Sequence, residues 1–160
     1  MFAVLYFVSC SILLLVAETL LRSVGLAVPL LGFFFVAASF AVSPRMSLVF
    51  AMLSGIALDF VMGYGASWSG LLLPLLTLPA VLLHGKRPAS DVLDFLIGAA
   101  IPLVMAVPNL RGTLMAPEAF ASLLTSCLFG AFLFPVVLAL VSRSALRLKF
   151  GPAGAGNGGS

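Results

Sequence analysis

The sequence predicts an all-α, polytopic membrane protein, a compact bundle of about six transmembrane helices. Its 160 residues are 62% hydrophobic and only 8% charged, with a mean hydropathy of +1.27. Soluble domains of this size do not have such a composition. With the exception of Asp59, the charged residues lie between the apolar runs or at their ends, which is typical of helical membrane proteins.

We expect residues 1–150 to form a single transmembrane helical domain, because no stretch is long and polar enough for a soluble domain. Residues 151–160 read GPAGAGNGGS, the composition of a flexible glycine-rich tail. The chain starts without the positively charged region of a signal peptide, so its first apolar run is interpreted as a retained helix.

Short polar, glycine or proline links separate six apolar runs. Glu18 and Arg22, four residues apart, close the first run and are interpreted as a local ion pair at the membrane edge. Internal prolines in the fourth and fifth runs favour bends or breaks, and the fifth run is short enough to span only partly. The predicted segments are 3–21, 24–42, 46–62, 68–83, 92–107 and 117–141.

The basic residues predict the orientation. Six segments place both termini on the same side of the membrane. That side collects Arg45, Lys86, Arg87, Arg143, Arg147 and Lys149, and the opposite side has Arg22 and Arg111. Because Lys and Arg are enriched in cytoplasmic loops, we expect both the N-terminus and the C-terminus to be cytoplasmic.

The third segment carries the most unusual residue of the chain. Asp59 lies well inside an apolar run, with Gly55 four residues before it and Gly63 four residues after it. Positions four apart share one face of a helix. A charged side chain within a membrane nearly always faces protein or a polar cavity, and glycine lets two backbones approach closely. We therefore expect this stripe to pack against another helix.

The glycines after Asp59 predict a tight turn into the fourth segment. The first N–H groups of any helix lack partners within that helix, and the helix dipole favours an anion beside them. Asp59 is therefore interpreted as a structural ligand of the next helix start, near Ser67, Trp68 and Ser69. The complete set of candidate structural or interaction residues is Gly55, Asp59, Gly63, Gly65, Ser67, Ser69 and Gly70.

No catalytic group, cofactor or metal site is expected from the sequence. The only histidine, His84, lies 17 residues after Ser67, about 25 Å along a helix, too far for a nucleophile and its base. Asp91 and Asp94 are interpreted as first-turn residues of a helix that Ser90 begins. The net charge of +3 is small and dispersed, which argues against a nucleic-acid partner.

The runs Gly55-Ile-Ala-Leu-Asp59 and Gly63-Tyr-Gly65-Ala-Ser-Trp-Ser-Gly70, with an acidic residue late in the first helix, resemble the rod shape-determining protein MreD family. The resemblance covers the first four segments, about half the chain. It implies a non-enzymatic component of the bacterial cell-wall elongation (rod) complex in the inner membrane, with a role in cell shape. The implied partners are MreC, then RodA and its transpeptidase, and indirectly MreB.

An alternative function is the substrate-capture subunit of a vitamin or metal importer, which is also a compact bundle of six helices. Such a subunit needs a polar pocket open to the outside. The residues that would line it are Asp59, Tyr64, Ser67, Trp68 and Ser69.

Overall fold

The computed structural model describes residues 2–24, 28–63, 68–83, 90–107 and 117–149, and within these ranges the chain forms six α-helices. The helices are α1 (Phe2–Ser23), α2 (Leu30–Ala41), α3 (Pro44–Met62), α4 (Trp68–Leu82), α5 (Asp91–Met105) and α7 (Pro117–Lys149). The expectation of an all-helical chain with six helices is confirmed. The predicted tail, 151–160, lies outside the described residues.

Three of the helices are long and apolar enough to cross a membrane, namely Val4–Ser23, Pro44–Met62 and Pro117–Leu146. By contrast, α2 has 12 residues and α4 and α5 have 15 each. At about 1.5 Å per residue, these three are shorter than the ~30 Å hydrocarbon core. The structure therefore supports membrane-spanning character for half of the six predicted segments.

Prolines explain some of the differences from the predicted boundaries. The segment expected from Val24 begins as a helix only at Leu30, directly after Pro29, since proline removes a backbone donor and favours helix starts. Pro74 and Pro79 lie inside α4, which continues through both without a break. The last helix extends past the expected end at Val141, to Lys149.

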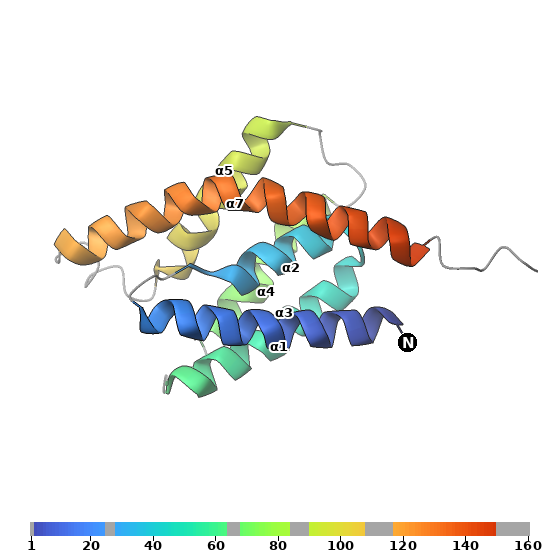
Figure 1. Ribbon diagram of the computed structural model, residues 1–160, viewed down its shortest axis with the longest axis horizontal. Coiled ribbons are helices and arrows are strands. Elements are labelled where there is room, and N and C mark those ends of the chain that lie inside the picture. Colours follow the sequence, from blue (N-terminus) through green and yellow to red (C-terminus); the bar gives the residue numbers. More distant parts are fainter. Residues whose placement is uncertain (1, 25–27, 64–67, 84–89, 108–116, 150–160) are drawn as a thin grey trace, which may run out of the picture.

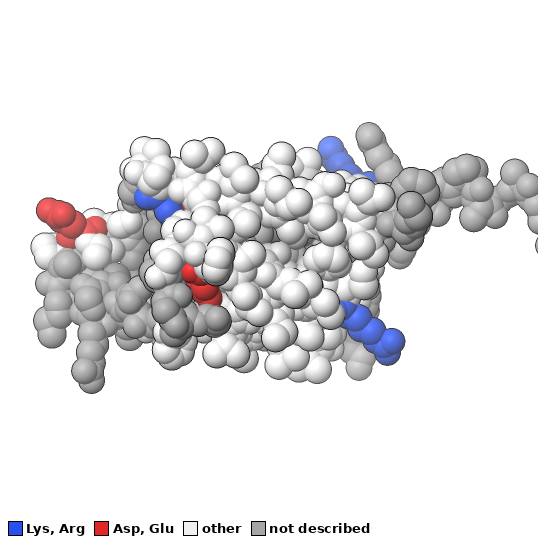
Figure 2. All heavy atoms as spheres, turned by 90° about the horizontal axis from the view of Figure 1, so that it is seen from below, with Lys and Arg blue, Asp and Glu red and all other residues white. Residues whose placement is uncertain are grey.

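The long helices define the axis of the bundle (Figure 1). There α1 and α7 run in opposite directions, so that the N-terminus and the C-terminal end of α7 lie at the same end, with α2 between the two helices. On the face seen in Figure 2, uncharged side chains cover the middle of the bundle. Basic side chains lie at one end, and both acidic and basic side chains lie toward the other. An apolar belt between two charged ends is the pattern that a bilayer requires.

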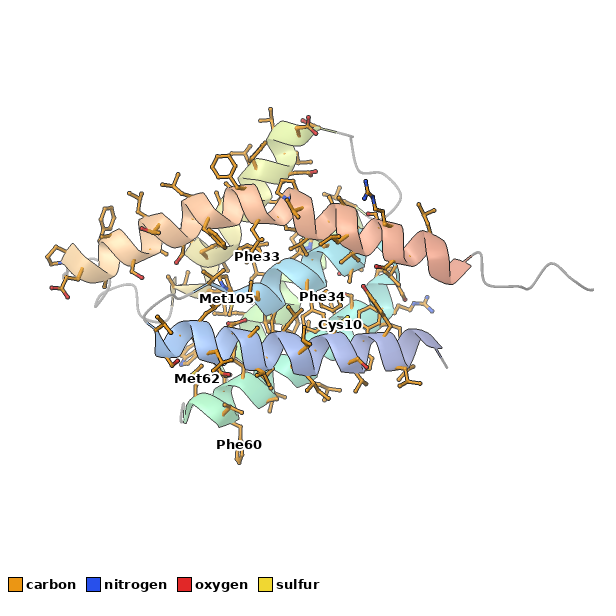
Figure 3. All side chains as sticks on the ribbon, viewed as in Figure 1. Cys10, Phe33, Phe34, Phe60, Met62 and Met105 are labelled. Atoms are coloured by element: carbon orange, nitrogen blue, oxygen red, sulfur yellow. The ribbon has the colours of Figure 1, made fainter. Side chains whose placement is uncertain are left out.

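The centre of the bundle is α2, which contacts the other five helices. Every residue from Leu31 to Ser39 is buried, which suits a helix that is apolar on all sides. Phe34 meets Phe7 of α1 at a ring-centroid distance of 5.9 Å, and Phe33 meets Phe134 of α7 at 6.5 Å. The consecutive phenylalanines of α2 thus reach helices on opposite sides of it (Figure 3).

The backbones of α5 and α7 touch at a pair of glycines. A Cβ atom added to Gly98 would collide with the carbonyl oxygen of Gly130, and one added to Gly130 would lie against the carbonyl oxygen of Gly98. In Figure 1, α5 crosses α7 steeply at its middle rather than running alongside it. Sequence analysis did not find this crossing, because each glycine stands alone in its own segment.

Replacing Gly98 by Ala is expected to destabilise the bundle by about 1–3 kcal/mol, the usual cost of forcing extra atoms into a packed contact. The control is Ala100→Leu, a larger change on the same helix at an exposed position. Thermal unfolding of the detergent-purified variants measures the effect. Equal melting temperatures for Gly98→Ala and Ala100→Leu would contradict the glycine contact.

Candidate functional site

The Asp59 carboxylate binds the start of the next helix. Asp59 lies in the last turn of α3 and is only 2% exposed. Its Oδ2 accepts the backbone N–H of Ser69 at 2.8 Å and that of Gly70 at 3.2 Å. Both donors belong to the first turn of α4, whose N–H groups have no partner within their own helix. The expected contact across the turn is confirmed.

Gly55 lets the backbones of α3 and α4 meet one turn before the carboxylate. A Cβ atom on Gly55 would collide with the backbone carbonyl of Ser69 and would lie 2.8 Å from the Cα atom of Gly70. Gly55, Ser69 and Gly70 are all buried. The expected close packing is therefore confirmed at Gly55. Together with Asp59 these residues form one contact, which we call the α3–α4 joint.

The predicted stripe is wrong at Gly63. The helix ends at Met62, and Gly63 is exposed. Among the described residues, none apart from its chain neighbours and its own helix comes within 4 Å of a Cβ atom added to it. Its φ of 70° places it in the left-handed region that glycine adopts most readily at helix ends. Once the chain leaves helical geometry, the four-residue spacing no longer holds a residue on the same face. Gly63 thus ends α3 instead of packing against a neighbour.

Glu18 is a second buried carboxylate that binds a helix start. It has no exposed surface, and its Oε2 accepts the N–H of Leu31 at 3.1 Å, in the first turn of α2. Its Oε1 accepts from Arg22 at 2.7 Å. The expected ion pair is present, but Glu18 is buried against α2 instead of lying at the edge. The sequence analysis did not predict this contact. The available signal was Glu18 itself, an acidic residue that precedes a helix start marked by Pro29.

Glu18 and Asp59 occupy equivalent places in two consecutive helix pairs. In each pair, a carboxylate near the C-terminal end of a long helix, α1 or α3, accepts N–H groups from the first turn of the shorter helix that follows. Both α1 and α3 run from the end that holds the N-terminus toward the opposite end (Figure 1). The two carboxylates therefore act at the same end of the bundle.

The other predicted site residues are divided. Ser69 and Gly70 belong to the α3–α4 joint, whereas Gly65 and Ser67 lie outside the described residues. Of the residues that would line an importer pocket, Asp59 and Ser69 are buried in the joint and Trp68 is 53% exposed. The other two residues of that pocket, Tyr64 and Ser67, lie outside the described part of the chain.

The acidic residues of α5 lie where the sequence placed them. Asp91 and Asp94 occupy the first turn of this helix, after Ser90 at its N-cap. In the ranges that the structure describes, His, Cys, Asp and Glu side chains do not gather in groups of three or more that could hold a metal ion. The candidate site therefore consists of Glu18 and Asp59, the two described carboxylates shown to accept backbone N–H groups of a following helix.

Comparison with known proteins provides no relative for this arrangement. The chain matches no protein-family model, no curated protein and no solved structure. Both carboxylates bind backbone amides of a following helix, which orients helices and does not in itself transform a substrate.

Asp59→Asn is expected to be mild and Asp59→Ala severe. Asparagine keeps an acceptor oxygen for the amides of Ser69 and Gly70, whereas alanine leaves both buried donors unpaired, at a cost of about 1–3 kcal/mol each. Thermal unfolding of the purified variants distinguishes the two cases. If both variants lost stability equally, the negative charge itself would be the important property, and a bound cation or a basic partner would replace the capping role.

Arg22→Met is expected to destabilise the bundle by about 3–5 kcal/mol, because it leaves the carboxylate of Glu18 buried without its partner. Adding Glu18→Gln to that variant should restore most of the loss, since glutamine is neutral and still accepts the N–H of Leu31. Unfolding measurements on both single variants and the double variant form a complete cycle. If the double variant lost as much stability as the two single variants added together, the two side chains would act independently.

Proposed function

We propose that this chain is a non-enzymatic subunit of the bacterial inner membrane that acts by binding other membrane segments, as a member of the cell-wall elongation complex similar to the MreD family. The α3–α4 joint is the observation that carries this proposal. Gly55, Asp59, Ser69 and Gly70, all part of the motif on which the resemblance rests, meet in one contact. A motif whose residues bind one another supports an architectural role.

The use of the carboxylate also favours a structural subunit over an enzyme. Asp59 is 2% exposed, and its Oδ2 accepts two backbone donors, so this oxygen is already engaged within the protein. A general acid or base has to reach the reacting group of a substrate. We therefore assign Asp59 to holding α3 and α4 at a fixed separation, and with them the surface that this pair offers to partners.

The proposed binding surface is the outer face of α3. Met52, Leu53, Ile56 and Phe60 are all exposed on it. Phe60 is 87% exposed and points away from the bundle in Figure 3. In this proposal, the face binds the membrane helix of MreC and through it RodA, its transpeptidase and MreB. Both termini are proposed to be cytoplasmic, in keeping with the basic residues of the sequence and with the shared end of the start of α1 and the C-terminal end of α7.

Affinity purification of the tagged chain from native bacterial membranes tests this function. We expect wall-synthesis proteins, MreC above all, to be recovered with the chain. Recovery of ATPase subunits in their place would overturn the proposal in favour of the importer.

The same purification links the function to the α3–α4 joint. Gly55→Leu is expected to lower both the melting temperature and the recovery of partners, because a side chain at this position separates the two backbones. Ala100→Leu, at an exposed position of α5 away from the proposed binding surface, is the control and should preserve both the melting temperature and the recovery of partners. Unchanged partner recovery with Gly55→Leu would show that partners do not depend on the joint.

A further inference from the structure

The exposed apolar surface of α3 and α4 is short compared with that of α1 and α7. Exposed apolar side chains extend over residues 49–61 on α3 and 71–82 on α4, against 4–20 on α1 and 120–146 on α7. At ~1.5 Å per residue, these stretches measure about 18, 17, 24 and 39 Å along their helices. The bundle therefore offers much less apolar length to a bilayer on its α3–α4 side than along α7.

Charges and a turn limit this short surface at its ends. The exposed Arg45 lies in the first turn of α3, four residues before Val49 and so on the same face of the helix. At the other end, Gly63 stops α3. In the sequence, Lys86 and Arg87 follow closely after α4. Neither helix can therefore present a longer apolar face without drawing a charge or a helix end into the hydrocarbon.

The α3–α4 joint keeps the two short surfaces together. Asp59 binds the amides of Ser69 and Gly70, and the backbones touch at Gly55, so α4 cannot slide along α3 without breaking these contacts. In Figure 1, α3 is also inclined to α1, which makes its span along the bundle axis shorter than its length. A helix that is too short for a bilayer gains nothing from tilting, because tilt shortens the span further.

The shortfall is large compared with the dimensions of a bilayer. The hydrocarbon core is ~30 Å thick. Even the whole part of α3 that follows Arg45, residues 46–62, is only about 26 Å long. A bilayer meets a short apolar surface by becoming thinner beside it, whereas a helix that is too long, as α7 is, adapts by tilting. The mismatch that the bilayer itself has to absorb therefore lies on the α3–α4 side.

We propose that the α3–α4 side of the bundle binds a locally thinned bilayer, formed by phospholipids with short acyl chains. The match of apolar length determines this preference, so it requires no particular headgroup. The proposal depends on the membrane location of the chain and not on its membership of the cell-wall elongation complex. It is measured on the isolated chain, so its failure would leave the partner purification unaffected.

Thermal unfolding of the full chain in liposomes tests this preference. Three phosphatidylcholines that differ only in acyl-chain length give hydrocarbon cores below, near and above ~30 Å. We expect the melting temperature to be highest in the thinnest bilayer and about 5 °C lower in the thickest. An equal melting temperature in all three, or a maximum in the thickest, would overturn the proposal. So would cross-linked dimers in the thickest bilayer at an unchanged melting temperature, which would assign this side to a second copy of the chain.

Arg45→Leu tests whether α3 sets the preference. Leucine at this position extends the apolar face of α3 by one turn, about 6 Å, and should roughly halve the difference in melting temperature between the thinnest and the thickest bilayer. Arg143→Leu is the matched control, because it removes the same charge from an exposed position of α7, whose apolar face already extends beyond it. This variant should keep the full difference. If the two variants behaved alike, the short face of α3 would not be the cause, and the proposal would be wrong.

Discussion

The hydrogen bonds from Asp59 to the amides of Ser69 and Gly70 are the constraint on which the α3–α4 pair depends. A helix start buried among apolar side chains has N–H groups that water cannot reach, and each unsatisfied group costs several kcal/mol in a membrane. One carboxylate oxygen satisfies two of these groups at 2.8 and 3.2 Å. Close contact at Gly55 is then tolerated, because the polar groups that it buries already have an acceptor.

In the first helix pair, α1 and α2, the carboxylate of Glu18 likewise accepts a backbone N–H from the start of the second helix. This carboxylate divides its two oxygens between the N–H of Leu31 and the guanidinium of Arg22, whereas Asp59 has no salt-bridge partner in the described residues. A buried carboxylate is costly unless it is paired and hydrogen-bonded. The arginine thus offsets part of the cost of Glu18, and the two amides at a helix start offset part of the cost of Asp59.

The spacing of residues within a segment was sufficient to predict the structural features that depend on residues close together in the sequence. Hydropathy gave six helices, and the position of Asp59 before a glycine turn gave its contact with the next helix. Spacing failed at Gly63, because the helix ends one residue earlier and the periodicity ends with it. The Gly98–Gly130 crossing and the burial of Glu18 depend on which segments meet in space. The sequence of a single segment does not contain that information.

The burial of α2 has a consequence for how the protein is made. This helix has 12 residues, too few to span the hydrocarbon core on its own, and α7, which covers its Phe33 side, follows it by more than seventy residues. During synthesis, α2 therefore reaches the membrane long before its cover exists. Contacts so distant in sequence form late. Until the last helix is made, the nascent chain can bury the phenylalanine-rich α2 only against the helices already present, and a chain that ends before α7 leaves the Phe33 side of α2 uncovered by that helix.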